Sequence, residues 1–234
     1  MRYHNVERAV FLDRPNRFVA HVLLGGKPET VHVKNTGRCR ELLRPGAEVW
    51  LERAETPGRK TGFDLIAVRK DSGVLVNIDS QAPNQAVKAW LEAQGFSGIV
   101  PEYRFGSSRI DFRMEKDGRP YLLEVKGCTL EVDGVGYFPD APTERGVKHL
   151  RELTRAVGEG WRAAIAFVIQ MDGVTEVRPN AATHPEFAAA LQAAAEAGVE
   201  VWFLPCHVEP DRLEIRASQP APGYENTTDM EVRA

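Results

Sequence analysis

The segment 108–126 carries two carboxylates and an ammonium group whose spacing could bring them together on a β-hairpin. Apolar and polar residues alternate on either side of Asp117-Gly118, a dipeptide that suits a two-residue type I′ turn. With that turn, cross-strand partners have numbers that sum to 235, so Asp111 faces Glu124. Lys126 lies two residues beyond Glu124, and its side chain therefore emerges on the same face.

This grouping is suited to work on a phosphate ester. Two carboxylates about 4–5.5 Å apart across a ladder can share a hard divalent cation, because such cations prefer oxygen ligands. A bound cation lowers the pKa of a water molecule and offsets the charge of a phosphate. A neighbouring lysine can orient or deprotonate the attacking water, or stabilise the phosphate electrostatically. The same spacing is also common on solvated strands, where Glu and Lys simply face water, so the motif alone leaves both interpretations open.

Length and composition are those of an ordinary globular protein. The chain has 234 residues, 43% of them hydrophobic and 27% charged, which allows one large domain or two small ones. It has no apolar run of membrane-spanning length and no signal-peptide core at its start, so we expect no membrane association. Cys39, Cys128 and Cys206 are far apart and odd in number, which favours a reducing, cytoplasmic location over a disulfide framework or a zinc ribbon.

The charge distribution suggests two modules. Residues 1–82 carry 14 Lys and Arg against 10 Asp and Glu, whereas residues 83–234 carry 16 against 23. The N-terminal third is therefore basic and the remainder acidic, although the net charge of the whole chain is only −3. The overall charge gives no support for nucleic-acid binding, but the basic first module is compatible with it.

Residues 1–82 are predicted to form a small β-rich domain. Short strand-like runs at 19–24, 30–33, 48–51, 63–69 and 74–78 are separated by glycine- and proline-containing turns. Five short strands in so few residues favour a small sandwich or barrel, and the OB-type barrel is one such fold.

Basic side chains in this first domain are candidates for nucleic-acid binding. They are Arg14, Arg17, Arg38, Arg40, Arg59 and Lys60. Arginines beside loop amides and the aromatic Phe18 could grip phosphates and stack on bases, but scattered arginines are equally typical of a solvated face. The loop 35–38 contains Asn and Gly, so it could form a nest of amides that holds an anion, or simply be a tight turn.

Residues 83–217 are predicted to form a mixed α/β domain. Helices are expected at 84–94, 143–157 and 185–197, with Thr143 as the N-cap of the second, and strands at 99–103, 163–171, 199–204 and 213–216 in addition to the hairpin. Residues 218–234, rich in proline and acidic side chains, are expected to be disordered.

Other side chains of this domain could join the carboxylates on the hairpin. Glu102 lies on the strand before it, and Glu92, on the preceding helix, is a second candidate acid. Arg145, Lys148 and His149 lie on a helix that begins shortly after the hairpin, where they could meet a phosphate backbone. The alternative is an ordinary amphipathic helix with a basic outer face.

The ordered series of motifs resembles the sugar fermentation stimulation protein (SfsA) family, from about residue 8 to residue 205. The C-terminal matches are SRIDF at 108–112, LEVK at 123–126 and FPDAPTERGVKHLREL at 138–153. The N-terminal matches are RF at 17–18, HVKNTGR at 32–38, RK at 59–60 and VN at 76–77. The hairpin by itself looks like the active-site signature of PD-(D/E)XK nucleases, and the longer match strengthens that interpretation.

The resemblance implies a two-domain α/β protein: an N-terminal OB-like β-barrel that binds nucleic acid (1–82), and a restriction-endonuclease-like mixed sheet flanked by helices (83–217). Asp111 and Glu124 would bind Mg²⁺ or Mn²⁺, Lys126 would serve the attacking water, and Glu102 would be an accessory acid. The expected partner is DNA, with RNA as an alternative, and a homodimer is left open.

The family resemblance leaves the activity to be decided between two classes. The leading hypothesis is a cytoplasmic DNA-binding protein with a metal-dependent nuclease site, in which Arg145, Lys148 and His149 line the path of the phosphates. The alternative is a non-catalytic DNA-binding regulator of sugar (maltose) metabolism genes, as the family is described. Clustered acids favour the enzyme, because unscreened carboxylates repel a polyanion. A third reading, an oligosaccharide-binding barrel, is suggested only by the versatility of the OB fold.

Overall fold

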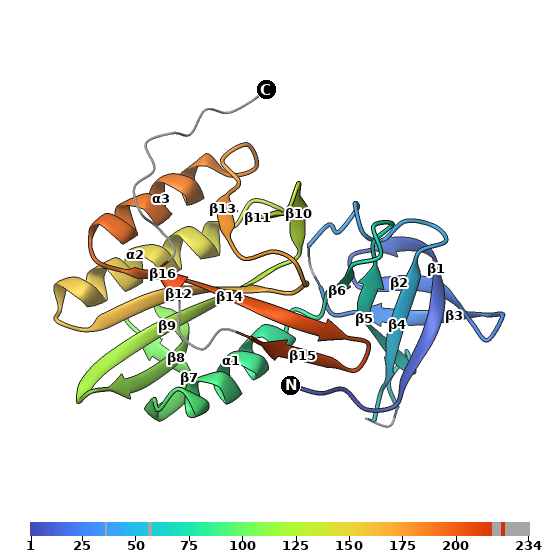
Figure 1. Cartoon of the computed structure of the whole chain (residues 1–234), viewed down its shortest axis with the longest axis horizontal. Helices are drawn as coiled ribbons and strands as arrows, with labels where there is room; N and C mark the ends of the chain where they lie inside the picture. The colour runs from blue at the N-terminus through green and yellow to red at the C-terminus, as the bar shows by residue number, and fades with distance from the viewer. Residues whose placement is uncertain (36, 56–57, 217–220, 223–234) are drawn as a thin grey trace.

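The computed structural model describes residues 1–35, 37–55, 58–216 and 221–222, which form two lobes (Figure 1). The first lobe is a closed β-barrel, and the second is a curled mixed sheet with few helices. This is the two-domain α/β arrangement that the sequence predicts. No helix in the described part of the chain is long and apolar enough to cross a membrane.

The barrel is an N-terminal OB domain. Its strands are β1 (Val6–Asn16), β2 (Val19–Leu24), β3 (Lys27–Val33), β4 (Glu48–Arg53) and β5 (Phe63–Arg69). They pair in the order β3-β2-β1-β4-β5, and a parallel pairing of β3 with β5 closes the barrel around a buried apolar interior. A short strand, β6 (Leu75–Asn77), pairs with β5.

Strand β1 was missed at the sequence level, although four of the five barrel strands were predicted. The run at 74–78 was expected to be the fifth strand of the barrel, but it forms β6, and β1 takes that place. The end of β1 contains Pro15 and several charged residues, and its pairing with β2 is irregular around Asp13. Proline and charged residues make a strand difficult to predict from sequence. A bulged strand that faces solvent nevertheless tolerates both.

The second lobe is organised around one mixed sheet. Its strands are β7 (Ser97–Phe105), β8 (Ser108–Lys116), β9 (Arg119–Cys128), β12 (Arg162–Ile169), β14 (Glu200–Glu209) and β15 (Arg212–Ile215), in the order β15-β14-β12-β9-β8-β7. The central strands β9, β12 and β14 are parallel, and the outer pairs are antiparallel. A small separate sheet consists of β10 (Leu130–Val132), β11 (Val135–Phe138) and β13 (Val177–Pro179).

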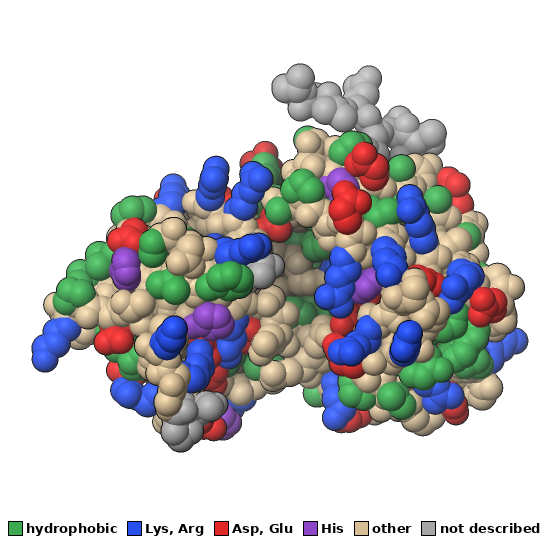
Figure 2. Space-filling model, turned by 180° about the vertical axis from the view of Figure 1, so that it is seen from behind, with side chains coloured by type: hydrophobic (Ala, Val, Ile, Leu, Met, Phe, Trp, Pro, Cys, Tyr) green, Lys and Arg blue, Asp and Glu red, His purple; other side chains and the backbone are tan. Residues whose placement is uncertain are grey.

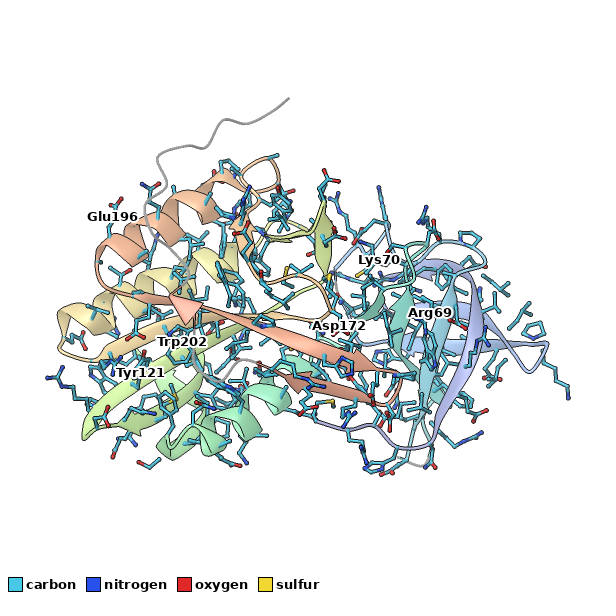
Figure 3. All side chains as sticks on the ribbon, in the orientation of Figure 1. Arg69, Lys70, Tyr121, Asp172, Glu196 and Trp202 are labelled. Carbon is cyan, nitrogen blue, oxygen red and sulfur yellow. The ribbon has the colours of Figure 1, made fainter. Side chains whose placement is uncertain are left out.

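Helices cover both faces of this sheet. Helix α1 (Ala82–Ala93) lies on one face, and α2 (Glu144–Gly158) and α3 (Pro185–Glu196) pack together on the other (Figure 1). The Thr143 hydroxyl accepts a hydrogen bond from the Gly146 amide, which confirms the predicted N-cap of α2. On the α1 side, the rings of Tyr121 and Trp202 have centroids 5.6 Å apart (Figure 3).

Gln170 joins the two lobes directly after strand β12. Its Nε2 atom donates hydrogen bonds to the backbone oxygens of Asn77 and Asp79, both at 3.1 Å, and its backbone oxygen accepts one from the Asn77 amide. Gln170 also lies against Gly127, where a Cβ atom would be 2.2 Å from Gln170 Oε1. A Cβ atom at this position would force the Gln170 side chain to shift, so the junction between the lobes depends on the glycine next to Lys126.

The C-terminal tail was expected to be disordered from residue 218. Within it the structure describes only β16 (Ala221–Pro222), which pairs with Trp202 and Phe203 of β14. The remaining residues of that prediction, 218–220 and 223–234, lie outside the described residues. Cys39, Cys128 and Cys206 are buried and free, so the expectation that the chain has no disulfide framework holds for its three cysteines.

Candidate metal site on the central hairpin

The hairpin of β8 and β9 has the predicted register. Lys116 pairs with Arg119 and Phe112 with Leu123, so partner numbers sum to 235. Asp117 and Gly118 have φ values of 53° and 71°, as a two-residue type I′ turn requires. The regular pairing of β8 with β9 ends at Phe112 and Leu123, and Asp111 is the next residue along β8.

Asp111 is anchored through both of its carboxylate oxygens. Its Oδ2 atom accepts a hydrogen bond from the Val125 amide at 2.8 Å, which ties it to β9 directly after Glu124. Its Oδ1 atom accepts one from Asn84 Nδ2 of α1, also at 2.8 Å. Burial and the neighbouring Glu124 carboxylate raise the pKa of Asp111 to about 6. Burial is the larger cause, and the Glu124 carboxylate adds to it because a neighbouring negative charge disfavours ionisation of Asp111.

Glu124 is almost completely buried, at 2% exposed. Burial alone would raise its pKa, but Lys126 and His149 outweigh that effect and hold the pKa of Glu124 below its usual value. Lys126 Nζ donates to Glu124 Oε1 at 2.6 Å, as expected for side chains on one face. The other oxygen, Oε2, is buried and has no hydrogen-bond partner among the described residues.

His149 provides the second contact to Glu124. It lies on α2 and is 4% exposed, and its Nδ1 atom hydrogen-bonds Glu124 Oε1. Arg145 Nε donates to His149 Nε2 at 3.3 Å, so Nε2 is the acceptor and the Nδ1 proton points to Glu124. We expected His149 to line a phosphate path, but its ring is instead packed inside, against the carboxylate.

Glu124 Oε2 and the two Asp111 oxygens are the atoms of this site that could bind a hard divalent cation. A buried carboxylate oxygen without a partner is costly unless an ion or a water molecule satisfies it, and Glu124 Oε2 is such an atom. Each oxygen of Asp111 accepts one hydrogen bond from a described residue and keeps a second lone pair. Within the described ranges, no group of three or more His, Cys, Asp and Glu side chains is placed so that it could hold a metal ion by itself. Two carboxylates supplemented by water and phosphate oxygens suit Mg²⁺ or Mn²⁺.

The backbone of Glu102 lies close to Asp111, but its carboxylate pairs with Arg109 instead of joining Asp111 and Glu124. The pairs Pro101–Phe112 and Tyr103–Ile110 flank it, so it lies opposite Asp111 on β7. Its side chain is 56% exposed and pairs with Arg109, with Glu102 Oε2 3.1 Å from Arg109 Nη1. Its role as an accessory acid stays a prediction. Glu92 is exposed on α1 and pairs with Lys88.

Family comparison agrees with this architecture over most of the chain. The model described as "SfsA N-terminal OB domain" matches residues 12–78, and the "Sugar fermentation stimulation protein RE domain" matches residues 81–212. The chain belongs to the SfsA family. Sugar fermentation stimulation protein homologues of Ruminiclostridium cellulolyticum and Desulfitobacterium hafniense are 49% and 50% identical over 219 and 217 residues, which cover 92% of this chain in each case and 96% and 95% of those proteins.

A solved SfsA structure shares the fold of both lobes. It is described as the structure of Pyrococcus furiosus SfsA in complex with Ca²⁺, and it is 30% identical to this chain with a TM-score of 0.84. The match covers 92% of this chain and 95% of that one. The barrel and the mixed sheet are therefore features shared with a known member of the SfsA family.

Two of the predicted nucleic-acid-binding arginines in this SfsA-family barrel have structural partners. Arg14 donates hydrogen bonds to four backbone oxygens in and near the loop 35–38. Arg59 binds the buried Asp64 carboxylate with two hydrogen bonds, one of them at 3.0 Å. Arg14 thus holds the carbonyls of Asn35, Gly37 and Arg38, while the Arg38 amide donates to the Asp140 carboxylate at 3.2 Å; whether these amides bind an anion from solution stays a prediction.

The other predicted residues are exposed and available to a ligand. Arg17, Arg38 and Arg40 border one surface pocket of about 470 Å³, and Lys60 is exposed on the loop before β5. On α2, Arg145 and Lys148 are exposed, and Lys148 Nζ also donates to the Ser107 backbone oxygen at 3.0 Å. Figure 2 shows Lys and Arg side chains on both lobes beside the hollow that separates them.

Sequence reasoning missed Asn84 and the inner role of His149. Asn84 is 27 positions from Asp111 in the sequence, and His149 is 25 from Glu124. No local pattern links residues so far apart. The family motif at 138–153 does single out His149, but it does not indicate that its partner is Glu124.

Proposed function

We propose that this protein is a metal-dependent phosphodiesterase that cleaves DNA, with RNA as the alternative substrate. The observation that carries the proposal is the buried, unpartnered Oε2 atom of Glu124 beside the Asp111 carboxylate. A folded protein keeps such an atom next to a second carboxylate when a cation completes the site. The P. furiosus relative described as a Ca²⁺ complex supports this reading, because Ca²⁺ also takes oxygen ligands.

Each residue of the site has a defined part in the proposal. Asp111 and Glu124 would hold Mg²⁺ or Mn²⁺. The bound ion would supply a water molecule of lowered pKa and offset charge on the scissile phosphate. Lys126 uses one of its three N–H donors on Glu124, so two remain to orient the attacking water. Such a proton-directing group contributes about 10²–10⁴-fold to the rate.

The second helix serves both the ion site and the substrate. His149 would position Glu124 by fixing which of its oxygens faces the ion. Arg145 and Lys148, exposed on α2, would contact substrate phosphates close to that carboxylate. The OB barrel would hold the nucleic acid away from the cut. The reaction would take place in the cytoplasm, a reducing compartment that suits three free cysteines.

A non-catalytic DNA-binding regulator is the competing function. In that case Asp111 and Glu124 would bring two negative charges to a surface that has to bind a polyanion. Without a cation they would repel phosphates. The enzyme therefore accounts for the acids, and the regulator does not.

The test is cleavage of single- and double-stranded DNA and RNA with Mg²⁺ or Mn²⁺. Wild type, Asp111→Asn and Lys126→Met are compared with Arg119→Gln, which removes an exposed charge at the far end of the same hairpin. We expect metal-dependent cutting that both site variants reduce by about 100-fold or more and that the control retains. Salt-sensitive binding without any cutting would establish the regulator instead. Cutting that persists in both site variants would show that the site is wrong.

A further inference from the structure

A surface pocket of about 470 Å³ lies on the OB barrel, apart from the carboxylates of the hairpin. Phe11 of β1 and Leu43, both buried residues, contribute apolar surface to its wall. Its volume is in the range of pockets that bind small organic groups, about 300–1,000 Å³. The pocket therefore has room for one nucleotide unit.

Hydrogen bonds from Arg14 tie the wall of this pocket together. The Arg14 guanidinium donates to the backbone oxygens of Asn35, Gly37 and Arg38 on one side and to that of Arg17 on the other. It thus connects the end of β1 and the following turn to the loop 35–38. A site that is formed before the ligand arrives loses less free energy to ordering on binding.

The pocket presents positive charge that the protein itself does not neutralise. Arg17, Arg38 and Arg40 line it and are exposed, and none of their guanidinium groups forms an ion pair with another described residue. Asp13 also lines the pocket and lies 2.8 Å from His21, but its single carboxylate is outnumbered by the guanidinium groups around it. Unpaired guanidinium groups around a preformed pocket favour a phosphate-bearing ligand.

An exposed aromatic ring stands beside this cationic rim. Phe18 is 49% exposed, whereas most large apolar side chains of the barrel are buried. The Arg17 guanidinium lies 5.1 Å from the centre of the Phe18 ring. A ring in water next to a guanidinium provides a flat surface on which a nucleobase can stack.

From this arrangement we infer that the pocket binds one nucleotide of a single-stranded nucleic acid, with its base on Phe18 and its phosphates at Arg38 and Arg40. In a duplex both faces of a base are covered by its neighbours, so stacking on a protein ring requires an unpaired base. The inference rests on the proposed function and adds a substrate class to it: a nucleic acid with a single-stranded segment beside the site of cleavage.

The pocket is connected to the hairpin site by a short series of contacts. The Arg38 amide donates to Asp140 Oδ2 at 3.2 Å. Asp140 lies four residues before the first residue of α2, the helix on which Arg145 hydrogen-bonds His149 and His149 hydrogen-bonds Glu124. In this proposal, a strand held in the pocket would continue along the start of α2 towards Asp111 and Glu124.

The experiment measures binding of the full-length protein to a fluorescein-labelled oligodeoxythymidine of about 12 nucleotides and to a blunt duplex, with EDTA present so that nothing is cut. Variants are Phe18→Leu, Phe18→Trp and the double change Arg38→Gln with Arg40→Gln. The matched control is Lys27→Gln, which removes a positive charge from the exposed β2–β3 turn of the same barrel.

We expect Phe18→Leu to lower the ratio of single-strand to duplex affinity by about tenfold, and Phe18→Trp to restore it. The slope of log affinity for the single strand against log salt concentration should be less steep by about 1.4 in the double arginine variant. This value corresponds to the loss of two phosphate contacts at about 0.7 each. An unchanged ratio in Phe18→Leu would overturn the inference, as would an unchanged salt slope. If the wild type cleaves with metal and the variants give these negative results, only the pocket is refuted. If the wild type binds no nucleic acid, the proposed function itself is refuted.

Discussion

His149 Nδ1 and Lys126 Nζ both donate to the same oxygen of Glu124, Oε1, which leaves Oε2 of that buried carboxylate without a partner among the described residues. Arg145 fixes the tautomer that makes this possible, because it donates to the other ring nitrogen of His149. The carboxylate is thus oriented before any cation arrives. The orientation depends on α2, an element that contributes no ligand of its own.

His149→Phe should weaken divalent-cation binding by about 10–100-fold, because the ring fills the same space but cannot donate to Glu124. His149→Asn, which keeps an N–H donor close to the position of Nδ1, should lose less affinity. The measurement is Mn²⁺ affinity by calorimetry. Arg151→Gln, an exposed change on the same helix, serves as the control. Equal affinity in His149→Phe and wild type would show that His149 merely fills space.

The hairpin could be predicted from the sequence because its information is local. Asp117-Gly118 specifies the turn, the turn fixes the register, and the register brings Asp111 to Glu124. The cap at Thr143 is equally local. The partner of His149 could not be predicted, because it depends on how α2 packs on the sheet.

The sequence also could not predict which arginines are bonded within the protein and which are exposed to a ligand. In the sequence, Arg14 and Arg59 cannot be distinguished from Arg38 and Arg40. In the structure, however, Arg14 donates to backbone oxygens and Arg59 to the Asp64 carboxylate. Whether a guanidinium is free depends on which acceptors the fold places around it. That placement involves residues from several strands and loops, which no short pattern encodes.

Asp64 should make the stability of the barrel dependent on acidity. Burial alone would raise its pKa, but hydrogen bonds from Arg59, Lys34 and His32 lower the pKa of Asp64 to about 2. A carboxyl whose pKa is lower in the folded state stabilises the fold at pH values above about 4, and this contribution disappears as the pH falls towards 2.

Asp64→Asn should therefore lower the free energy of unfolding at pH 7 by about 1–2 kcal/mol, after allowance for solvent screening. Urea unfolding at pH 7 and at pH 3 measures this, and the difference from wild type should shrink at the lower pH. Asp71→Asn, which changes an exposed acid paired with Arg44, is the control. A difference that grows at low pH would contradict the assignment.

Gly127→Ala should disturb the junction between the lobes. The new methyl group would lie 2.2 Å from Gln170 Oε1, so Gln170 must move away from Asn77 and Asp79. Overpacking of this kind costs about 1–3 kcal/mol, seen as a lower midpoint of thermal unfolding. Gly158→Ala, at the end of α2 with open space around it, should be neutral or stabilising. Equal melting temperatures of Gly127→Ala and wild type would show that the junction tolerates the change.

The central claim is that Asp111 and Glu124 together hold one divalent cation, and a Mn²⁺ titration of the full chain followed by calorimetry tests it most directly. We predict saturable binding of one ion per chain in wild type and at least about tenfold weaker binding in Asp111→Asn. Asp111→Asn is the decisive variant, because asparagine still offers an oxygen to the Val125 amide and the hairpin stays in place. Wild-type affinity in that variant, or no binding to the wild type, would contradict the claim.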